Sequence, residues 1–495
     1  MLRKFTDVAV VYVQRYMPDP FVYAVILTLI CVVLNFALVP GSSIDGIVTA
    51  WYGGVWGENN IFTFALQMTL ILVSGYTLAQ TPPVQRLLGW LAAKPRTQVQ
   101  GAVLIFFCAG VASLLNWGLG LIVAGVMARE VARQLGRGFH YGYLVAAGYM
   151  GYIVWTNGFS SSIALANTDP HSELNVIYQE THKLVPFSDS IFQPYSWIGV
   201  AVTFAVFPFL LKLTAPRHEL VPDFSESEQQ DGDGGRPAVA ARSGSGDQRG
   251  GGPVGPGSGG EAEPQRAGVA TLEGDEPARP RRTFAETMER AWILNLVLVA
   301  AGVGFFVMSG YALNIASMVM LFTVLGLLLH GTPARFIAAF YESAKTSGSL
   351  LLQYPLYGGV IALLTVAPNG HDTLASAIAG ALVNAANQTT LPFLNYIGSL
   401  IISLFVPSGG GHWGVQGPVT IAAAQQLGLT SVPYLGKLSM SVAVGEQVTN
   451  MIQPFWALPV LAIAGVRLRD MMGFTVIAFV AGAVIFGAAT FIPAF

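Results

Sequence analysis

Charge is scarce in this 495-residue chain. Only 11% of the residues are Asp, Glu, Lys or Arg, and 53% are hydrophobic. A soluble domain carries about 25% charged residues, so this composition excludes an ordinary soluble globular protein. Several uncharged runs reach the ~20 apolar residues that cross a bilayer; they include residues 21–39, 292–309 and 474–492. The sequence therefore predicts an all-α membrane protein that crosses the bilayer many times.

Cysteine, cofactor motifs and a cleavable leader are also scarce or missing. The only two cysteines, Cys31 and Cys108, lie in apolar runs, which predicts thiols at membrane depth and not a disulfide. The histidines and cysteines show no metal-ligand spacing, so we expect no metal and no cofactor. The phosphate-binding motif GxxxxGK[ST] is absent, which argues against transport driven by ATP. The start of the chain shows no small-residue cleavage site, so the first span is expected to stay in the membrane.

The most informative stretch that is present is FVPSGGGHWGVQGPVT, residues 405–420. Its flanks are as apolar as a membrane span, yet three successive glycines follow a proline, and each glycine costs a helix about 1 kcal/mol relative to alanine. Broken backbone at membrane depth is tolerated only where it is buried in protein or lines a cavity. Its free amides can bind a small polar solute. The candidate substrate-binding residues here are Ser408, Gly409, Gly410, Gly411, His412, Trp413 and Gln416.

A second break is predicted in the first half of the chain. Residues 98–128 form an uncharged run that is too long for one straight span and too short for two. A basic loop with Arg86, Lys94 and Arg96 precedes the run, and Arg129 follows it. Basic loops lie on the cytoplasmic side, so the run is predicted to be a re-entrant hairpin that opens there. Its tip supplies the further substrate-binding candidates Asn116, Trp117 and Gly118.

Two further spans are interrupted by polar residues, which predicts broken helices at about 141–166 and 439–465. The first contains Asn157, and the second contains Glu446, Gln447 and Asn450. A carboxylate at the bilayer centre costs about 3 kcal/mol and usually marks a transport pathway or a proton relay. We therefore take these four residues as candidates for ion coupling.

Simpler interpretations of these residues remain open at this point. The glycine run would also suit a tight surface turn, and His412 with Trp413 would suit interfacial packing. Glu446 could pair with a neighbouring helix, and the asparagines could hydrogen-bond one helix to another. The serine and histidine of SGGGH also invite comparison with an enzyme nucleophile and base, but no third orienting group is apparent. An enzyme is therefore not predicted.

The elements recur in the same order in two halves of the chain. The N-terminal half, residues 1–215, holds the hairpin at about 98–128 and the broken helix at about 141–166. The C-terminal half, residues 291–495, holds a hairpin at about 391–428 and the broken helix at about 439–465. Between them, residues 216–290 are rich in Gly, Pro and Ser and predict a disordered cytoplasmic linker. The charge bias gives the two hairpins opposite mouths, which predicts an inverted repeat.

Specific motifs resemble those of the short-chain fatty acid transporter family, which includes bacterial permeases for acetoacetate and butyrate. In the second half they are VPSGGGHWGVQGP at 406–418, GEQ at 445–447 and QPFWALPVLAIAG at 453–465. In the first half they are PDP at 18–20, QM at 67–68, NWG at 116–118 and AREVAR at 128–133. The chain departs from the family pattern in its longer linker and in Trp155-Thr156-Asn157-Gly158, where the family has Trp-Gly-Gly-Gly.

The resemblance implies a secondary transporter of short-chain monocarboxylates, such as acetoacetate or butyrate, in a prokaryotic plasma membrane. It also implies an elevator-type mechanism and, by analogy, a homodimer. We expect coupling to Na⁺ or to a proton, with the N-terminus and the linker cytoplasmic. No nucleic-acid partner is expected. The alternative from another class is a passive anion channel or uniporter for small carboxylates.

Overall fold

The computed structural model describes residues 20–216, 283–368, 370, 372–404, 406, 408–453 and 455–495. Residues 1–19 of the N-terminal half and 217–282 of the linker lie outside the described residues, as do Phe405, Pro407 and Pro454. The described part is helical and contains no β-strand, which confirms the all-α prediction. At the end of the segment expected to be a linker, Phe284–Glu289 forms the short helix α13.

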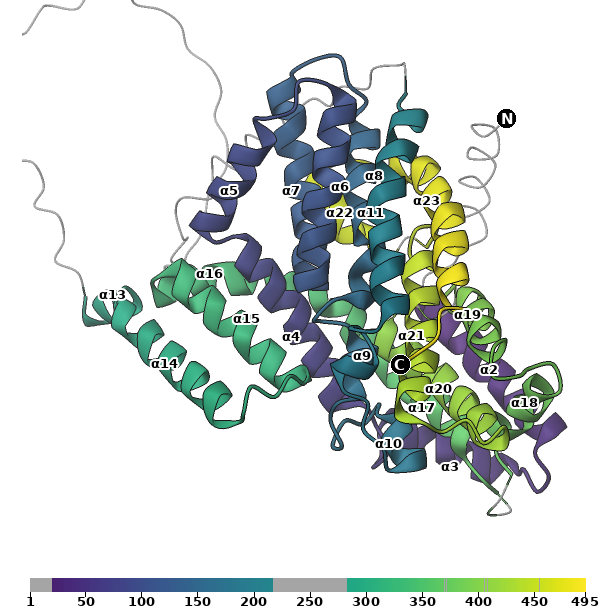
Figure 1. Cartoon of the computed structure of the whole chain (residues 1–495). Helices are drawn as coiled ribbons and strands as arrows, with labels where there is room; N and C mark the ends of the chain where they lie inside the picture. The colour runs from purple at the N-terminus through teal and green to yellow at the C-terminus, as the bar shows by residue number, and fades with distance from the viewer. Residues whose placement is uncertain are drawn as a thin grey trace, which may run out of the picture. The chain divides into compact units, whose positions relative to one another are not determined.

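The helices follow one another with short connections in both halves (Figure 1). Those of the first half are α2 (Pro20–Leu38), α3 (Ile44–Val55), α4 (Phe62–Ala79), α5 (Pro82–Ala92), α6 (Gln98–Leu115), α7 (Trp117–Leu135), α8 (Tyr141–Gly151), the 3₁₀ segment η1 (Tyr152–Asn157), α9 (Ser162–Ala166), α10 (Val176–Thr181), η2 (Phe187–Asp189) and α11 (Pro194–Thr214). Those of the second half are α14 (Trp292–Met308), α15 (Ile315–His330), α16 (Pro333–Ala344), η3 (Lys345–Ser347), α17 (Gly348–Thr365), α18 (Leu374–Val383), α19 (Leu391–Ile402), α20 (Gly409–Gln426), α21 (Val432–Thr449), α22 (Ala457–Ala464) and α23 (Leu468–Ala489).

Four of the described helices, α4, α6, α11 and α23, are long and apolar enough to cross a membrane by themselves. The segments Pro333–Ser347 and Leu350–Thr365, bent by 47° at their junction, would together make a fifth span. Large apolar side chains on α2, α11 and α14 are exposed; examples are Val33, Phe209 and Leu298. Exposed apolar surface of this kind suits contact with lipid, so the chain is a membrane protein.

Of the basic loop predicted from Arg86, Lys94 and Arg96, the last two lie in the connection before α6, whereas Arg86 lies in a helix, because Pro82–Ala92 forms α5. Pro82 and Pro83 occupy the first turn of this helix. Proline is tolerated there because the first-turn amides have no acceptor within the helix. Leu88 and Ala92 are buried on one face, and the ammonium of Lys94 lies 4.2 Å from the centre of the Trp90 ring.

Corresponding helices of the two halves make corresponding contacts. α2 and α3 of the first half pack against α17, and α15 and α16 of the second half pack against α4. Likewise α4 and α5 pack on α7, while α17 and α18 pack on α20. α22 contacts α7, and α9 contacts α20. Figure 1 shows two groups that follow from these contacts, one around α6, α7 and α8 and one around α17, α18 and α20. This correspondence is what a structural repeat produces, and its orientation in a bilayer stays a prediction.

Candidate functional site

The first hairpin breaks at Asn116, between α6 and α7. The Asn116 side chain caps α7, because its Oδ1 accepts a hydrogen bond of 2.9 Å from the amide of Leu119. Its Nδ2 donates to the carbonyl of Ile71 on α4 at 3.4 Å. Asn116 is fully buried, and a Cβ at Gly75 would lie 2.1 Å from its Oδ1. Both ends of this amide therefore hold the tip of the hairpin against α4.

Ser408 has the equivalent position in the second hairpin, at the start of α20. Its Oγ accepts from the amide of Gly411 at 3.4 Å and donates to the hydroxyl of Tyr354 on α17 at 2.7 Å. The first amides of a helix have no acceptor within it, so those of Gly409 and Gly410 point out of the end of α20. This end is buried, with Ser408 only 2% exposed. The partial positive charge of a helix N-terminus favours an anion.

The broken helix α8–η1–α9 lies beside both tips. The amide of Trp117 donates to Ser160 Oγ at 2.8 Å, and the rings of Trp117 and Trp155 are 6.3 Å apart. On the other hairpin, a Cβ at Gly409 would lie 2.8 Å from the Trp155 ring and 2.3 Å from Ser162 Oγ. Trp155 and the serines after it thus separate the two tips.

The break in α8–η1–α9 is held by α21. Gln447 Oε1 accepts three hydrogen bonds, from the Thr156 amide at 3.1 Å, the Thr156 hydroxyl at 2.5 Å and Asn157 Nδ2 at 3.2 Å. Asn450 Oδ1 accepts from Trp155 Nε1 at 3.1 Å. Three of the four ion-coupling candidates therefore have structural hydrogen bonds. Gln447 holds the backbone at Thr156 and also bonds to Asn157, and Asn450 holds the indole of Trp155.

Glu446 differs from these residues because its carboxyl is fully buried and neither oxygen has a hydrogen-bond partner. A Cβ at Gly409 would lie 3.1 Å from Glu446 Oε2, so this carboxyl lies at the N-terminus of α20. Other buried polar atoms nearby are also without partners, among them the hydroxyls of Ser161 and Ser162 and Asn157 Oδ1. Unsatisfied buried polar groups cost free energy, so such a cluster is expected to bind a polar ligand.

The remaining candidates on α20 lie inside the protein. His412 Nε2 lies 2.8 Å from Gln416 Oε1, and Gln416 Nε2 donates to the carbonyl of Asn395 on α19 at 2.8 Å. Trp413 is completely buried, and its indole Nε1 has no partner. Gln416 also lines an apolar cavity of about 290 Å³ between α2, α18, α19 and α20, so it faces away from the start of the helix.

The two hairpin tips contact α4 at different positions. The tip of the second hairpin contacts α4 at Phe64, since a Cβ at Gly410 would strike the Phe64 ring. The tip of the first hairpin contacts α4 at Ile71 and Gly75, where Asn116 bonds and packs. These positions on α4 are 7 to 11 residues apart, which is about 10–16 Å along a helix. The structure thus groups Ser408–Gly411 with Glu446, Trp155 and Ser162, and Asn116 contacts α4 further along the helix.

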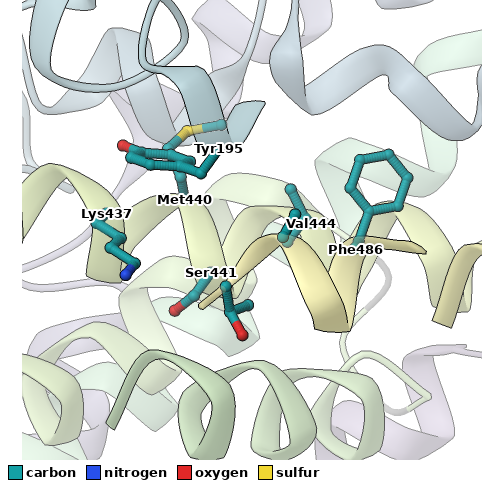
Figure 2. A pocket seen from close by; sticks show the side chains of 8 residues that line it. Tyr195, Lys437, Met440, Ser441, Val444 and Phe486 are labelled. Carbon is teal, nitrogen blue, oxygen red and sulfur yellow. The ribbon is translucent and has the colours of Figure 1, made fainter. Parts of the chain in front are cut away.

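Among the described residues, Lys437 is the only buried lysine or arginine. Figure 2 shows its side chain on α21 near Ser441, with Tyr195 and Phe486 around the same cavity. The volume of this cavity is about 10 Å³, close to the space that one water occupies. The cavity is too small for a fatty acid. The part of the chain that the structure describes holds no group of three His, Cys, Asp or Glu suited to a metal.

Trp155, Ser161 and Ser162 are site residues that the sequence reasoning did not select. Their signal was present, because three serines follow Thr156-Asn157-Gly158 within an apolar run. That signal says only that the span is interrupted. It does not say that the interruption faces the start of α20, nearly 250 residues further along the chain.

A helical membrane protein whose broken helices enclose unpaired polar groups is typical of membrane transport proteins. The chain belongs to the short chain fatty acid transporter family, whose model matches residues 1–229 and 270–492. The unmatched residues 230–269 lie in the Gly-rich segment between the halves. The family is one of transporters and not of enzymes.

Two proteins named for short-chain fatty acid transport are similar over nearly their whole length. One, from Escherichia coli (strain K12), is 34% identical over 479 residues, which is 96% of each chain. The other, from Haemophilus influenzae, is 31% identical over 493 residues, which is 98% of each chain. The fold is also similar to that of Neisseria gonorrhoeae MtrF, with a TM-score of 0.51 and 13% identity over 99% of this chain and 97% of that one. MtrF is described as one of a class of antimetabolite efflux pumps, and this likeness concerns the fold alone.

Proposed function

We propose that this protein is a cation-coupled carrier of short-chain monocarboxylates, such as acetoacetate or butyrate, that binds the substrate carboxylate at the N-terminus of α20. The observation that carries the proposal is the buried start of this helix, where the amides of Gly409 and Gly410 lie beside partnerless polar side chains. A helix N-terminus stabilises an anion by its free amides and its dipole. Family membership supplies the substrate class.

The short acyl tail is expected to lie against aromatic rings. Phe64, Trp155 and Tyr354 are aromatic side chains at the start of α20, since the first lies against Gly410, the second lies against Gly409 and the third bonds to Ser408. Trp413 follows within the first turns of the same helix. Trp117 contacts Trp155 and belongs to the other tip, so with Asn116 and Gly118 it is proposed to act in a different conformation of the carrier.

The coupling cation is proposed to bind among Asn157, Glu446, Gln447 and Asn450. Atoms without partners on these side chains include both oxygens of Glu446 and Oδ1 of Asn157. Carboxylate and amide oxygens suit Na⁺, and a carboxylate alone suits a proton. The corresponding contacts of the two halves support an inverted repeat with two re-entrant hairpins, and such repeats support alternating access. An elevator movement, a homodimer and a cytoplasmic N-terminus belong to this proposal.

The test of the binding site is substrate affinity in Ser408→Ala. This change removes the cap of α20 and the bond to Tyr354. A lost cap or hydrogen bond costs about 1 kcal/mol, so we expect the Kd for labelled butyrate to rise roughly five- to tenfold.

The matched control is Ser43→Ala, which removes the same kind of cap from α3, where Ser43 Oγ accepts from the amide of Gly46 at 3.1 Å. The control should bind as the wild type does. Unchanged affinity in Ser408→Ala, with both variants folded, would place the carboxylate elsewhere.

A further inference from the structure

Glu446 lies near the C-terminal end of α21, and this end packs against η1, α9, α19 and α20. Glu446 is the only acidic residue on α21 and on these four elements. Those elements also carry no lysine or arginine except Lys437, which lies nine residues earlier on α21. Nine residues of helix separate the two side chains by about 13 Å. The carboxyl of Glu446 therefore has no nearby positive side chain, and its closest source of positive potential is the N-terminus of α20.

The contact with Gly409 places Glu446 where a substrate carboxylate is proposed to bind. Two ionised carboxylates about 4 Å apart in a partly buried site repel strongly enough to weaken binding roughly a thousandfold. Two carboxyls that share a site avoid this repulsion by sharing one proton, as in the aspartic proteases. A protonated Glu446 would donate its O–H to the substrate, in addition to the amides of Gly409 and Gly410.

We propose that Glu446 competes with the substrate carboxylate for the N-terminus of α20 and must bind a proton before the substrate can bind. This inference rests on the proposed function and identifies its coupling ion. One proton then enters with each monocarboxylate, and the loaded carrier gains no net charge. The driving force is the pH difference across the membrane and not the membrane potential.

Other titratable groups lie on the elements around Glu446. They are His412 on α20, Tyr141, Tyr143 and Tyr149 on α8, Tyr152 on η1, Tyr354 and Tyr357 on α17, Tyr396 on α19, Tyr434 and Lys437 on α21, and Asp189 on η2. α9 carries no titratable side chain, and the charged residues of α23 lie in its first turn. The tyrosine hydroxyls are neutral at physiological pH. His412 is the one neighbour whose unperturbed titration would fall in the same range, so it needs a separate variant.

The test compares butyrate affinity at about pH 6 and about pH 8 in the wild type, Glu446→Gln, Glu446→Asp and His412→Gln. Because substrate binding requires one proton on Glu446, the wild-type Kd should rise by up to about tenfold per pH unit once the pH is high enough for this carboxyl to lose its proton. We expect Glu446→Gln to lose this dependence and to keep a low Kd at both pH values. Glu446→Asp and His412→Gln should keep the dependence, and so should Glu58→Gln, whose side chain is in an exposed loop.

A second measurement needs no variant. Proteoliposomes are given either a pH difference or a potassium diffusion potential, and protein-free liposomes correct for diffusion of the uncharged acid. Accumulation should follow the pH difference and be unaffected by the potential.

Three results overturn the inference. They are a Glu446→Gln variant with the wild-type pH dependence, wild-type binding that is equally tight at both pH values, and accumulation driven by a Na⁺ gradient alone. In each of these the proposed substrate still binds, so the proposed function survives. Absence of butyrate and acetoacetate binding at both pH values would overturn the proposed function together with the inference.

Discussion

Replacing Gln447 by leucine should destabilise the protein strongly, because one oxygen of this side chain satisfies three buried donors. Gln447→Leu keeps the apolar volume but leaves the Thr156 amide, the Thr156 hydroxyl and Asn157 Nδ2 without their acceptor. Each unpaired buried donor costs about 1–3 kcal/mol. The hydroxyl can rotate towards another acceptor, so we expect a total loss of about 2–5 kcal/mol.

The assay is the thermal unfolding midpoint of purified protein in detergent, read by tryptophan fluorescence. Gln447→Leu should lower the midpoint by several degrees. The matched control is Gln425→Leu, since Gln425 is exposed on α20 and makes one hydrogen bond, from its Nε2 to the carbonyl of Glu180 at 3.0 Å. Equal midpoints for the two variants would refute the reasoning, because they would mean that Gln447 does not hold the break at η1.

Two further pairs of variants distinguish residues of the proposed site from residues elsewhere in the fold. Gly409→Ala adds a methyl group 3.1 Å from Glu446 Oε2, so transport should fall by at least tenfold. The control Gly304→Ala on α14 meets no atom within 4 Å and should transport normally. Transport assays of both variants check this, and equal rates would contradict it. Asn116→Ala and Asn314→Ala each remove an N-cap and should each cost about 1 kcal/mol of stability. Only Asn116→Ala should slow transport, and normal uptake by it would exclude the first hairpin tip from the mechanism.

The helices were largely predictable from the sequence. The long uncharged runs predicted spans close to α2, α14 and α23, because the bilayer requires continuous apolar segments of this length. The interruptions were visible for the same reason, since Gly, Asn and Ser are costly within an apolar helix unless the structure uses them. The short helix α5 was missed because its Arg86 was grouped with Lys94 and Arg96 in one basic loop.

The contacts within the site were not predictable from the sequence. The unpaired carboxyl of Glu446 lies against Gly409, 37 residues earlier, and Gln447 bonds to Thr156 in the other half of the chain. Such pairings depend on how α21 packs between η1 and α20, and no local pattern encodes that packing. The same packing places the tips at Asn116 and Ser408 against different positions of α4.

Accumulation of labelled acetoacetate in proteoliposomes is the decisive measurement for coupled transport of a short-chain monocarboxylate. The purified wild-type protein is supplied with an inward proton gradient, and protein-free liposomes and the Ser408→Ala variant run beside it. We predict that the wild type concentrates acetoacetate above the outside level and that Ser408→Ala needs a higher concentration to do so. Equilibration without accumulation under a proton gradient and under a Na⁺ gradient would contradict a coupled carrier and identify a passive channel or uniporter.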